Sequence, residues 1–268
     1  MSTAPAPAGR AAVKGLAKAA AVGLAAGFLS GLFGVGGGIL IVPALVFALG
    51  FEQRLAHGTS LAAVLPIASS GLVAYAIEDK VDWPVAVALS VGAVVGAIVG
   101  TRVLHVLPQR VLTLGFALLL VATAARLLLD RSSADGRADL AVGSVLGLVV
   151  IGLASGVLAG LLGVGGGIIM VPAMVVLFGI PSTIARGTSL AVIVPTSVMG
   201  TVRNRRNRNA DLPVAAAVGL AGVVSGFPAG LLATRLDEDV ADITFAVLLL
   251  VVAVKLMVDL ARDPASRG

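Results

Sequence analysis

The chain contains no cysteine, one tryptophan and one tyrosine among its 268 residues. The absence of cysteine excludes disulfides, thiolate metal sites and cysteine nucleophiles. His57 and His105 are the only histidines, too few for a histidine-based metal site, so we predict no metal. Aromatic residues make up 4% of the chain, which leaves no platform for stacking nucleic-acid bases. We therefore predict no nucleic-acid partner.

Charged residues are also scarce, at 12% of the chain, whereas a typical globular protein has about 25%. Hydrophobic residues make up 58%, and the mean hydropathy is +1.07. Water could not solvate the surface of such a chain. The composition predicts an all-α polytopic integral membrane protein, whose first partner is the lipid bilayer. The net charge of +5 comes largely from arginines that lie between apolar runs, as topology signals do.

Several catalytic signatures are missing as well. The sequence has no Gly-x4-Gly-Lys-Ser/Thr, the loop that cradles nucleotide phosphates, and the apolar runs contain no Ser-His-Asp set. No Asp or Glu lies within a predicted span, where proton-coupled carriers usually place their carboxylate relays. A cationic substrate would also lack a counter-ion there. We therefore predict no enzymatic activity, no cofactor and an anionic substrate.

Apolar runs follow one another along the chain in two sets of five. They fall at about 16–33, 38–50, 55–77, 83–104 and 110–129, and again at about 140–162, 167–180, 187–202, 212–234 and 243–258. A membrane-spanning helix needs about 20 apolar residues, and the second run of each set has only about 13. Runs one and two of each set therefore form either one broken helix or a re-entrant pair, which gives eight to ten hydrophobic helical segments.

A glycine-rich turn occurs once in each set. Gly34–Ile39 reads Gly-Val-Gly-Gly-Gly-Ile, and Val-Pro-Ala follows after two further residues. The same two motifs recur at the same spacing from Gly163. Gly-Thr-Ser-Leu-Ala likewise occurs twice, from Gly58 and from Gly187, and half of the positions over 34–71 are identical to their counterparts. This pattern predicts an internal duplication into two homologous halves.

The duplication and the apolar runs predict the domain boundaries. We expect a disordered tail at 1–10, a first transmembrane repeat at 11–131, a connecting loop at 132–139, a second transmembrane repeat at 140–262 and a C-terminal tail at 263–268. Lys and Arg concentrate near both termini and in the loop Arg203–Arg208, which predicts that these segments are cytoplasmic. Five elements per half would make the repeats inverted and four would make them parallel; charge does not choose between them.

The glycine turns are the predicted binding site. Glycine inside an apolar helix marks a break, and such a break persists in a membrane only where protein, water or a ligand satisfies the backbone. A helix that restarts there offers free N–H groups and a partial positive charge to an anion. Two such breaks in matching positions are typical of a transporter's site. The alternative is that the glycines only permit close helix crossing.

Hydroxyl, cationic and proline residues flank the turns. The Thr-Ser pairs could cap the following helix or donate to the anion. Arg54, His57 and Arg186 could attract anions to the mouth of the site or lie at the interface. Small residues at every fourth position permit close helix packing; these are Gly92, Gly96, Gly100, Gly222, Gly226 and Gly230. The candidate substrate-binding residues are Gly34, Gly36, Gly37, Gly38, Ile39, Thr59, Ser60, Gly163, Gly165, Gly166, Gly167, Ile168, Thr188 and Ser189, with predicted helix kinks at Pro43, Pro66, Pro172 and Pro195.

The duplicated Gly-x-Gly-Gly-Gly-Ile, Val-Pro and Gly-Thr-Ser-Leu-Ala motifs resemble those of the TauE/SafE family of membrane permeases. The resemblance covers about residues 16–261. It implies a multi-pass protein of the bacterial plasma (inner) membrane that moves small sulfur-containing anions such as sulfite or organosulfonates, most often outward. By this resemblance, the family's signature positions fall on Gly34, Gly36, Gly37, Gly38, Gly163, Gly165, Gly166 and Gly167, on Pro43 and Pro172, and on Thr59, Ser60, Thr188 and Ser189.

We therefore predict a secondary transporter for a small anion that is held by backbone N–H groups at the two breaks. A passive anion channel and a membrane subunit or sensor that binds an anion without moving it alone are the alternatives, and an integral-membrane enzyme is more distant. The sequence is compatible with a coupling proton and with a homo-oligomer. It does not identify the anion.

Overall fold

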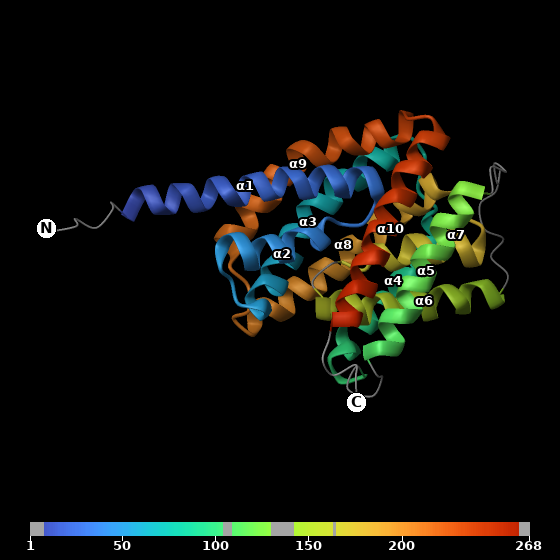
Figure 1. Ribbon diagram of the computed structural model, residues 1–268, viewed down its shortest axis with the longest axis horizontal. Helices are drawn as coiled ribbons and strands as arrows, with labels where there is room; N and C mark the ends of the chain where they lie inside the picture. The colour runs from blue at the N-terminus through green and yellow to red at the C-terminus, as the bar shows by residue number, and fades with distance from the viewer. Residues whose placement is uncertain (1–7, 104–108, 130–141, 163–164, 263–268) are drawn as a thin grey trace, which may run out of the picture.

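The apolar runs fold as helices. The computed structural model describes residues 8–103, 109–129, 142–162 and 165–262, and over these residues the chain forms ten α-helices and no strand (Figure 1). The helices are α1 (Ala8–Phe33), α2 (Gly38–Leu49), α3 (Gln53–Ile77), α4 (Trp83–Val103), α5 (Gln109–Leu129), α6 (Val142–Leu162), α7 (Gly167–Phe178), α8 (Ser182–Arg206), α9 (Leu212–Arg235) and α10 (Glu238–Arg262). The predicted all-α class is confirmed.

The predicted tail and loop boundaries fall mostly outside these residues. Residues 1–7, the connecting loop 132–139, the tail 263–268 and Gly163 are not among the described ones. Residues 8–10, which we assigned to the N-terminal tail, are the first residues of α1.

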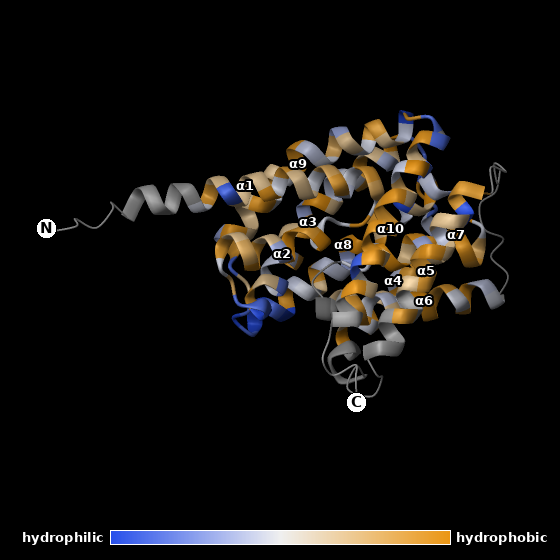
Figure 2. Cartoon of the chain, viewed as in Figure 1, coloured by the Kyte–Doolittle hydropathy of each residue, from blue (hydrophilic) through white to orange (hydrophobic). Residues whose placement is uncertain are grey.

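The outside of the helical bundle is apolar. Among the described residues, three stretches are long and apolar enough to cross a membrane, namely Gly15–Phe33, Gln53–Ile77 and Leu212–Arg235, and several shorter helices are also apolar. Side chains such as Phe47 (87% exposed), Leu118 (71%) and Val224 (69%) point away from the protein. Figure 2 shows hydrophobic residues over most of the bundle, with hydrophilic residues gathered at its ends. Apolar surface on this scale marks contact with something other than water, here lipid.

The short helices α2 and α7 begin and end at glycines in the left-handed region. The N-cap residues Gly37 and Gly166 have φ of 73° and 80°, and the C-cap residues Gly50 and Gly179 have φ of 69° and 68°. Residues with a Cβ rarely adopt this conformation. The duplicated glycines are therefore conformational requirements of two 12-residue helices.

After each break the chain folds back on the helix that it has just left. A Cβ on Gly37 would lie 2.7 Å from the carbonyl oxygen of Ala26 in α1. In the second half, a Cβ on Gly166 would lie 3.1 Å from the carbonyl oxygen of Ser155, while Gly147 faces the Phe178 ring near the far end of α7. The pairs α1–α2 and α6–α7 are thus re-entrant hairpins, and the alternative of one broken helix is wrong.

The two sequence-related helices α3 and α8 run antiparallel. Gly58, near the start of α3, packs against Asn204 in α8 and Asn209 just after it. Gly187, near the start of α8, packs against Tyr75 in α3 and Lys80 just after it. We call the end of the bundle with the turn after Arg206 the α8–α9 face, and the end with the turn after Ile77 the α3–α4 face. Matching elements therefore run in opposite directions, which answers the question of inverted or parallel halves. The duplication itself stays an inference from sequence.

Glycines let the helices pack at backbone distance. Helix α1 lies along α9 and α4 lies along α6 (Figure 1). The predicted packing role is confirmed where the glycines are described, because an added Cβ would come within 3.0 Å of another helix at Gly92, Gly96, Gly222, Gly226 and Gly230. The surroundings of Gly100 are not described.

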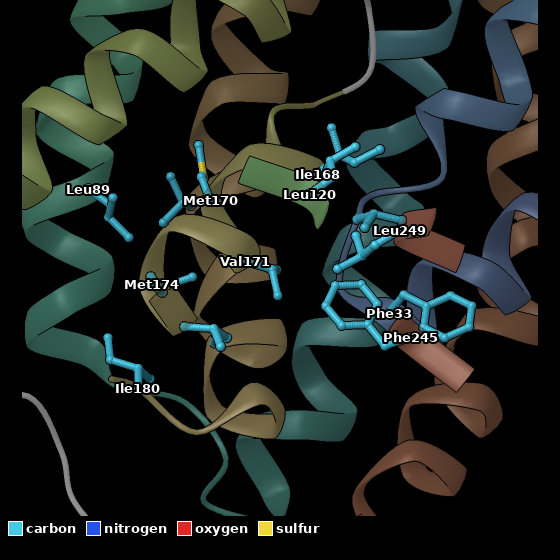
Figure 3. Packing of buried hydrophobic residues seen from close by; sticks show 14 of the residues in the cluster. Phe33, Leu89, Leu120, Ile168, Met170, Val171, Met174, Ile180, Phe245 and Leu249 are labelled. Atoms are coloured by element: carbon cyan, nitrogen blue, oxygen red, sulfur yellow. The ribbon is translucent and has the colours of Figure 1, made fainter. Parts of the chain in front are cut away.

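The two short helices differ in how they are covered. Helix α7 is buried along most of its length, in a cluster that includes Leu89 of α4 and Leu249 of α10. Figure 3 shows Met170, Val171 and Met174 of α7 in this cluster, with Phe33 beside Phe245. Helix α2 has only Gly38, Ile41 and Leu45 buried.

Candidate functional site

The two glycine breaks converge on one pair of side chains. A Cβ on Gly36 would lie 3.1 Å from Ile193 Cδ1 and 3.4 Å from Val64 Cγ1, and one on Gly165 would lie 3.3 Å from Ile193 Cγ2 and 3.4 Å from Val64 Cγ1. Val64 lies midway along α3 and Ile193 midway along α8. The sequence repeat therefore becomes a single site at half depth between the two faces.

Both short helices point their N-termini at this site. The first bonded N–H groups of α2 are those of Leu40 and Ile41, which donate to the Gly37 carbonyl at 3.1 and 3.2 Å; in α7, Ile169 and Met170 donate to Gly166 at the same distances. The N–H groups just before these have no acceptor within their own helix. Helix α2 then runs to the α8–α9 face and α7 to the α3–α4 face, so two partial positive charges meet at the centre.

The two breaks also touch each other. The Ser189 hydroxyl donates to the carbonyl oxygen of Gly34 at 2.9 Å. A Cβ on Gly167 would lie 2.7 Å from that same oxygen, and one on Gly34 would lie 2.6 Å from the Cα of Arg186. Five predicted site residues are thus brought together, namely Gly34, Gly36, Gly165, Gly167 and Ser189. The Ser189 proton serves the contact between the halves in this structure.

The threonines bind the opposite half. Thr188 Oγ1 accepts from the Asp82 N–H at 2.9 Å, and Thr59 Oγ1 accepts from the Asp211 N–H at 2.9 Å. Each aspartate accepts in turn from the first turn of the next helix. The capping role that we considered for the Thr-Ser pairs is wrong, because α3 and α8 begin several residues earlier and their N-caps are Glu52 and Pro181.

Replacing Thr188 by valine should lower the free energy of unfolding by about 1–3 kcal/mol, because the buried Asp82 N–H would lose its acceptor. Thr59→Val should lower the free energy of unfolding by a smaller amount, since Asp211 is only partly buried. The measurement is thermal unfolding of the purified protein in detergent. Thr188→Ser keeps the hydroxyl and is the matched control. Equal effects of valine and serine would contradict this role of the hydroxyl.

The remaining predicted residues that are described lie in the helices that flank the breaks, α2, α3, α7 and α8. Ser60 is buried, Ile168 is 6% exposed and Ile39 is half-buried. Gly38 is buried at the start of α2. The four prolines all lie inside helices, at Pro43, Pro66, Pro172 and Pro195. Within the described residues, no group of three or more His, Asp or Glu is placed to hold a metal ion.

Arg186 is buried and ion-paired. Its side chain is 1% exposed, its Nη2 lies 2.9 Å from Asp242 Oδ1, and the guanidinium carbon sits 4.8 Å from the centre of the Phe245 ring. Nη2 also donates to the Ala241 carbonyl at 3.1 Å. The interfacial role that we considered for Arg186 is therefore wrong, because α8 and α10 enclose the side chain.

Asp242 is a residue that sequence reasoning missed. We placed the last apolar run at about 243–258, whereas α10 begins at Glu238 and carries Asp242 in its second turn. The predicted run 243–258 contains no carboxylate, as we noted, but α10 extends beyond it toward its N-terminus and includes Asp242, which Arg186 neutralises. The only sequence feature that pointed toward this ion pair was the position of Arg186 directly before Gly187-Thr188-Ser189.

Comparison with known proteins gives one consistent family. Residues 19–256 match the family model described as sulfite exporter TauE/SafE. The chain is 29% identical over 212 residues to a "Probable membrane transporter protein" of Xylella fastidiosa, covering 78% of this chain and 81% of that one. It is 30% identical over 204 residues to the "Probable membrane transporter protein YunE" of Bacillus subtilis, covering 68% and 75%. No solved structure matches the chain.

Proposed function

The chain belongs to the TauE/SafE sulfite exporter family of membrane transporters, and on this premise we propose that it is a secondary transporter of a small oxyanion. The substrate would be a sulfur-containing anion such as sulfite or an organosulfonate, and transport would be outward. The proposal places this multi-pass protein in the bacterial inner membrane with both termini in the cytoplasm.

The convergence of both glycine breaks on Val64 and Ile193 carries this proposal. Two helix N-termini that meet at half depth supply N–H donors and a positive potential. The surrounding lipid provides neither of these to an anion. The N–H groups of Gly36–Ile39 and Gly165–Ile168 would hold the anion. Thr59, Ser60, Thr188 and Ser189 would keep the two breaks in place across the boundary between the halves.

Alternating access would come from movement of one half against the other. The boundary between the halves is extensive, because α1 packs along α9 and α4 along α6. It also includes polar contacts near the breaks, such as Ser189 with Gly34 and Thr188 with Asp82, and the apolar side chains of Val64 and Ile193 lie beside both breaks. Shifting these two helices would open the centre to one face at a time.

The test is flux in proteoliposomes of sulfite, sulfate, sulfoacetate, taurine and chloride, with and without a pH gradient. We expect saturable flux of one sulfur oxyanion. Flux that does not saturate and carries single-channel current would show a channel instead. Binding without flux from folded protein would show a sensor or a subunit that needs a partner. A response to the pH gradient would identify proton coupling.

A further inference from the structure

A cavity of about 350 Å³ opens at the α8–α9 face, between α3, α4, α6 and α8. Its outer rim carries Arg54, His57 and Arg203 together with three asparagines. Among the described residues that line it, none is Asp or Glu. A concave, low-dielectric site lined by charge of one sign concentrates ions of the opposite sign, so this cavity favours anions.

The inner end of the cavity reaches the glycine breaks. Leu61 and Thr196 form part of its lining, and each lies one helical turn from Val64 or Ile193, on the side toward the α8–α9 face. Ala159 also lines the cavity, and its Cβ lies 3.3 Å from the place that a Cβ on Gly166 would occupy. The cavity therefore leads from the face to the N-terminus of α7.

The opposite face is differently built at the matching positions. His57 and Arg186 both stand directly before a Gly-Thr-Ser, yet His57 lines the open cavity and Arg186 is sealed between α8 and α10. Asn204 packs against Gly58 as Tyr75 packs against Gly187, and the Tyr75 hydroxyl donates to the Leu32 carbonyl at 3.2 Å. Among the described residues, bulky and paired side chains thus occupy at the α3–α4 end the positions that line the open cavity at the other end.

We propose that the cavity is the vestibule through which a small oxyanion passes between the α8–α9 face and the glycine breaks, with Arg54, His57 and Arg203 setting its preference for anions. Its volume suits a small ligand with part of its hydration shell. This inference rests on the proposed transport of an anion, but its test requires no flux.

The absence of native cysteine makes the chain a ready background for thiol labelling. Met199 lines the cavity, and we would replace it in the full-length protein, Met199→Cys. The reagents are two methanethiosulfonates of similar size, one with a sulfonate and one with a trimethylammonium group. Relative to a free thiol in solution, the anionic reagent should react about tenfold faster than the cationic one.

Two controls isolate the cavity. Ser70→Cys, at the position of α3 that matches Met199, should react with neither reagent. Arg54→Gln added to Met199→Cys should reduce the preference for the anionic reagent severalfold. Arg206→Gln, which changes an exposed arginine on the same face outside the lining, should leave it nearly unchanged, because salt screens charges beyond about 8 Å.

The outcomes separate the vestibule from the transport function. Anion-selective labelling that sulfoacetate slows would support the vestibule even if no anion in the flux panel were transported. Unreactive Met199→Cys in folded protein, or equal rates with both reagents, would overturn the vestibule while saturable flux could still support transport. Labelling of Ser70→Cys at the same rate would overturn the one-sided opening.

Discussion

Replacing Gly165 by alanine should reduce anion flux at least about tenfold while the protein still assembles in the membrane. Gly165 has φ of 84°, and an L-residue in the left-handed region costs about 1–2 kcal/mol. The new methyl group would also meet Ile193 at 3.3 Å and Val64 at 3.4 Å. Relief of that strain would rotate the backbone N–H groups that we propose as the anion's ligands. Gly36→Ala should act in the same way, and initial rates in proteoliposomes measure both.

The matched control is Gly50→Ala. Gly50 has φ of 69°, similar to the site glycines, but a Cβ there meets nothing within 4 Å. The Gly50→Ala substitution therefore introduces comparable backbone strain away from the site, and this variant should retain most of the anion flux. Leucine at Gly37 is a less specific change, because any Cβ there meets the backbone of Ala26 and disturbs the hairpin. Normal flux in both Gly36→Ala and Gly165→Ala, or equal loss in Gly50→Ala, would contradict the site.

Replacing Asp242 by leucine should lower the free energy of unfolding by about 3–5 kcal/mol, because it leaves the buried Arg186 charge without its partner. The carbonyl of Ala241 and the hydroxyl of Ser182 also contact Arg186 Nη2, but neither carries a compensating charge. Thermal unfolding of the purified protein in detergent measures the effect.

Two variants distinguish the buried pair from ionic interactions in general. Glu78→Gln removes the ion pair between Glu78 and Arg235, whose side chains are 31% and 69% exposed. Because this pair is exposed, its loss should lower the free energy of unfolding by less than about 1 kcal/mol. The double variant Arg186→Met/Asp242→Leu removes the buried Arg186 charge together with its partner, whose side chain is 25% exposed, and should recover much of the stability lost in the single variant. A single variant as stable as Glu78→Gln would show that the buried pair does not stabilise the fold.

The sequence located the breaks because of a simple steric fact. Gly37 and Gly166 sit in a conformation that a Cβ makes unfavourable, so the requirement is visible as glycine in the sequence. The direction in which the chain leaves the turn is not visible in this way. It depends on several successive dihedral angles and on Ala26 and Ser155, which line the return path. The choice between a broken helix and a hairpin therefore needed the structure.

Burial of Arg186 could not be predicted for a different reason. Its partner Asp242 is on a helix far along the chain, and hydropathy placed that residue just outside the last apolar run. Thr59 and Thr188 are similar cases, since each accepts from a backbone N–H of the other half. Composition identifies such residues as polar groups near a turn. Only the tertiary arrangement decides whether they cap a helix, hold a ligand or join two halves.

The opposite orientation of α3 and α8 has a consequence for energy coupling. A carrier built from elements that run both ways across the membrane has no direction of its own, so gradients set the direction of net movement. A membrane potential of 100 mV, negative inside, is worth about 2.3 kcal/mol for each elementary charge, which is close to a fiftyfold concentration ratio. Where such a potential exists, an uncoupled anion carrier of this architecture would export its substrate by voltage alone, without ATP or a second ion.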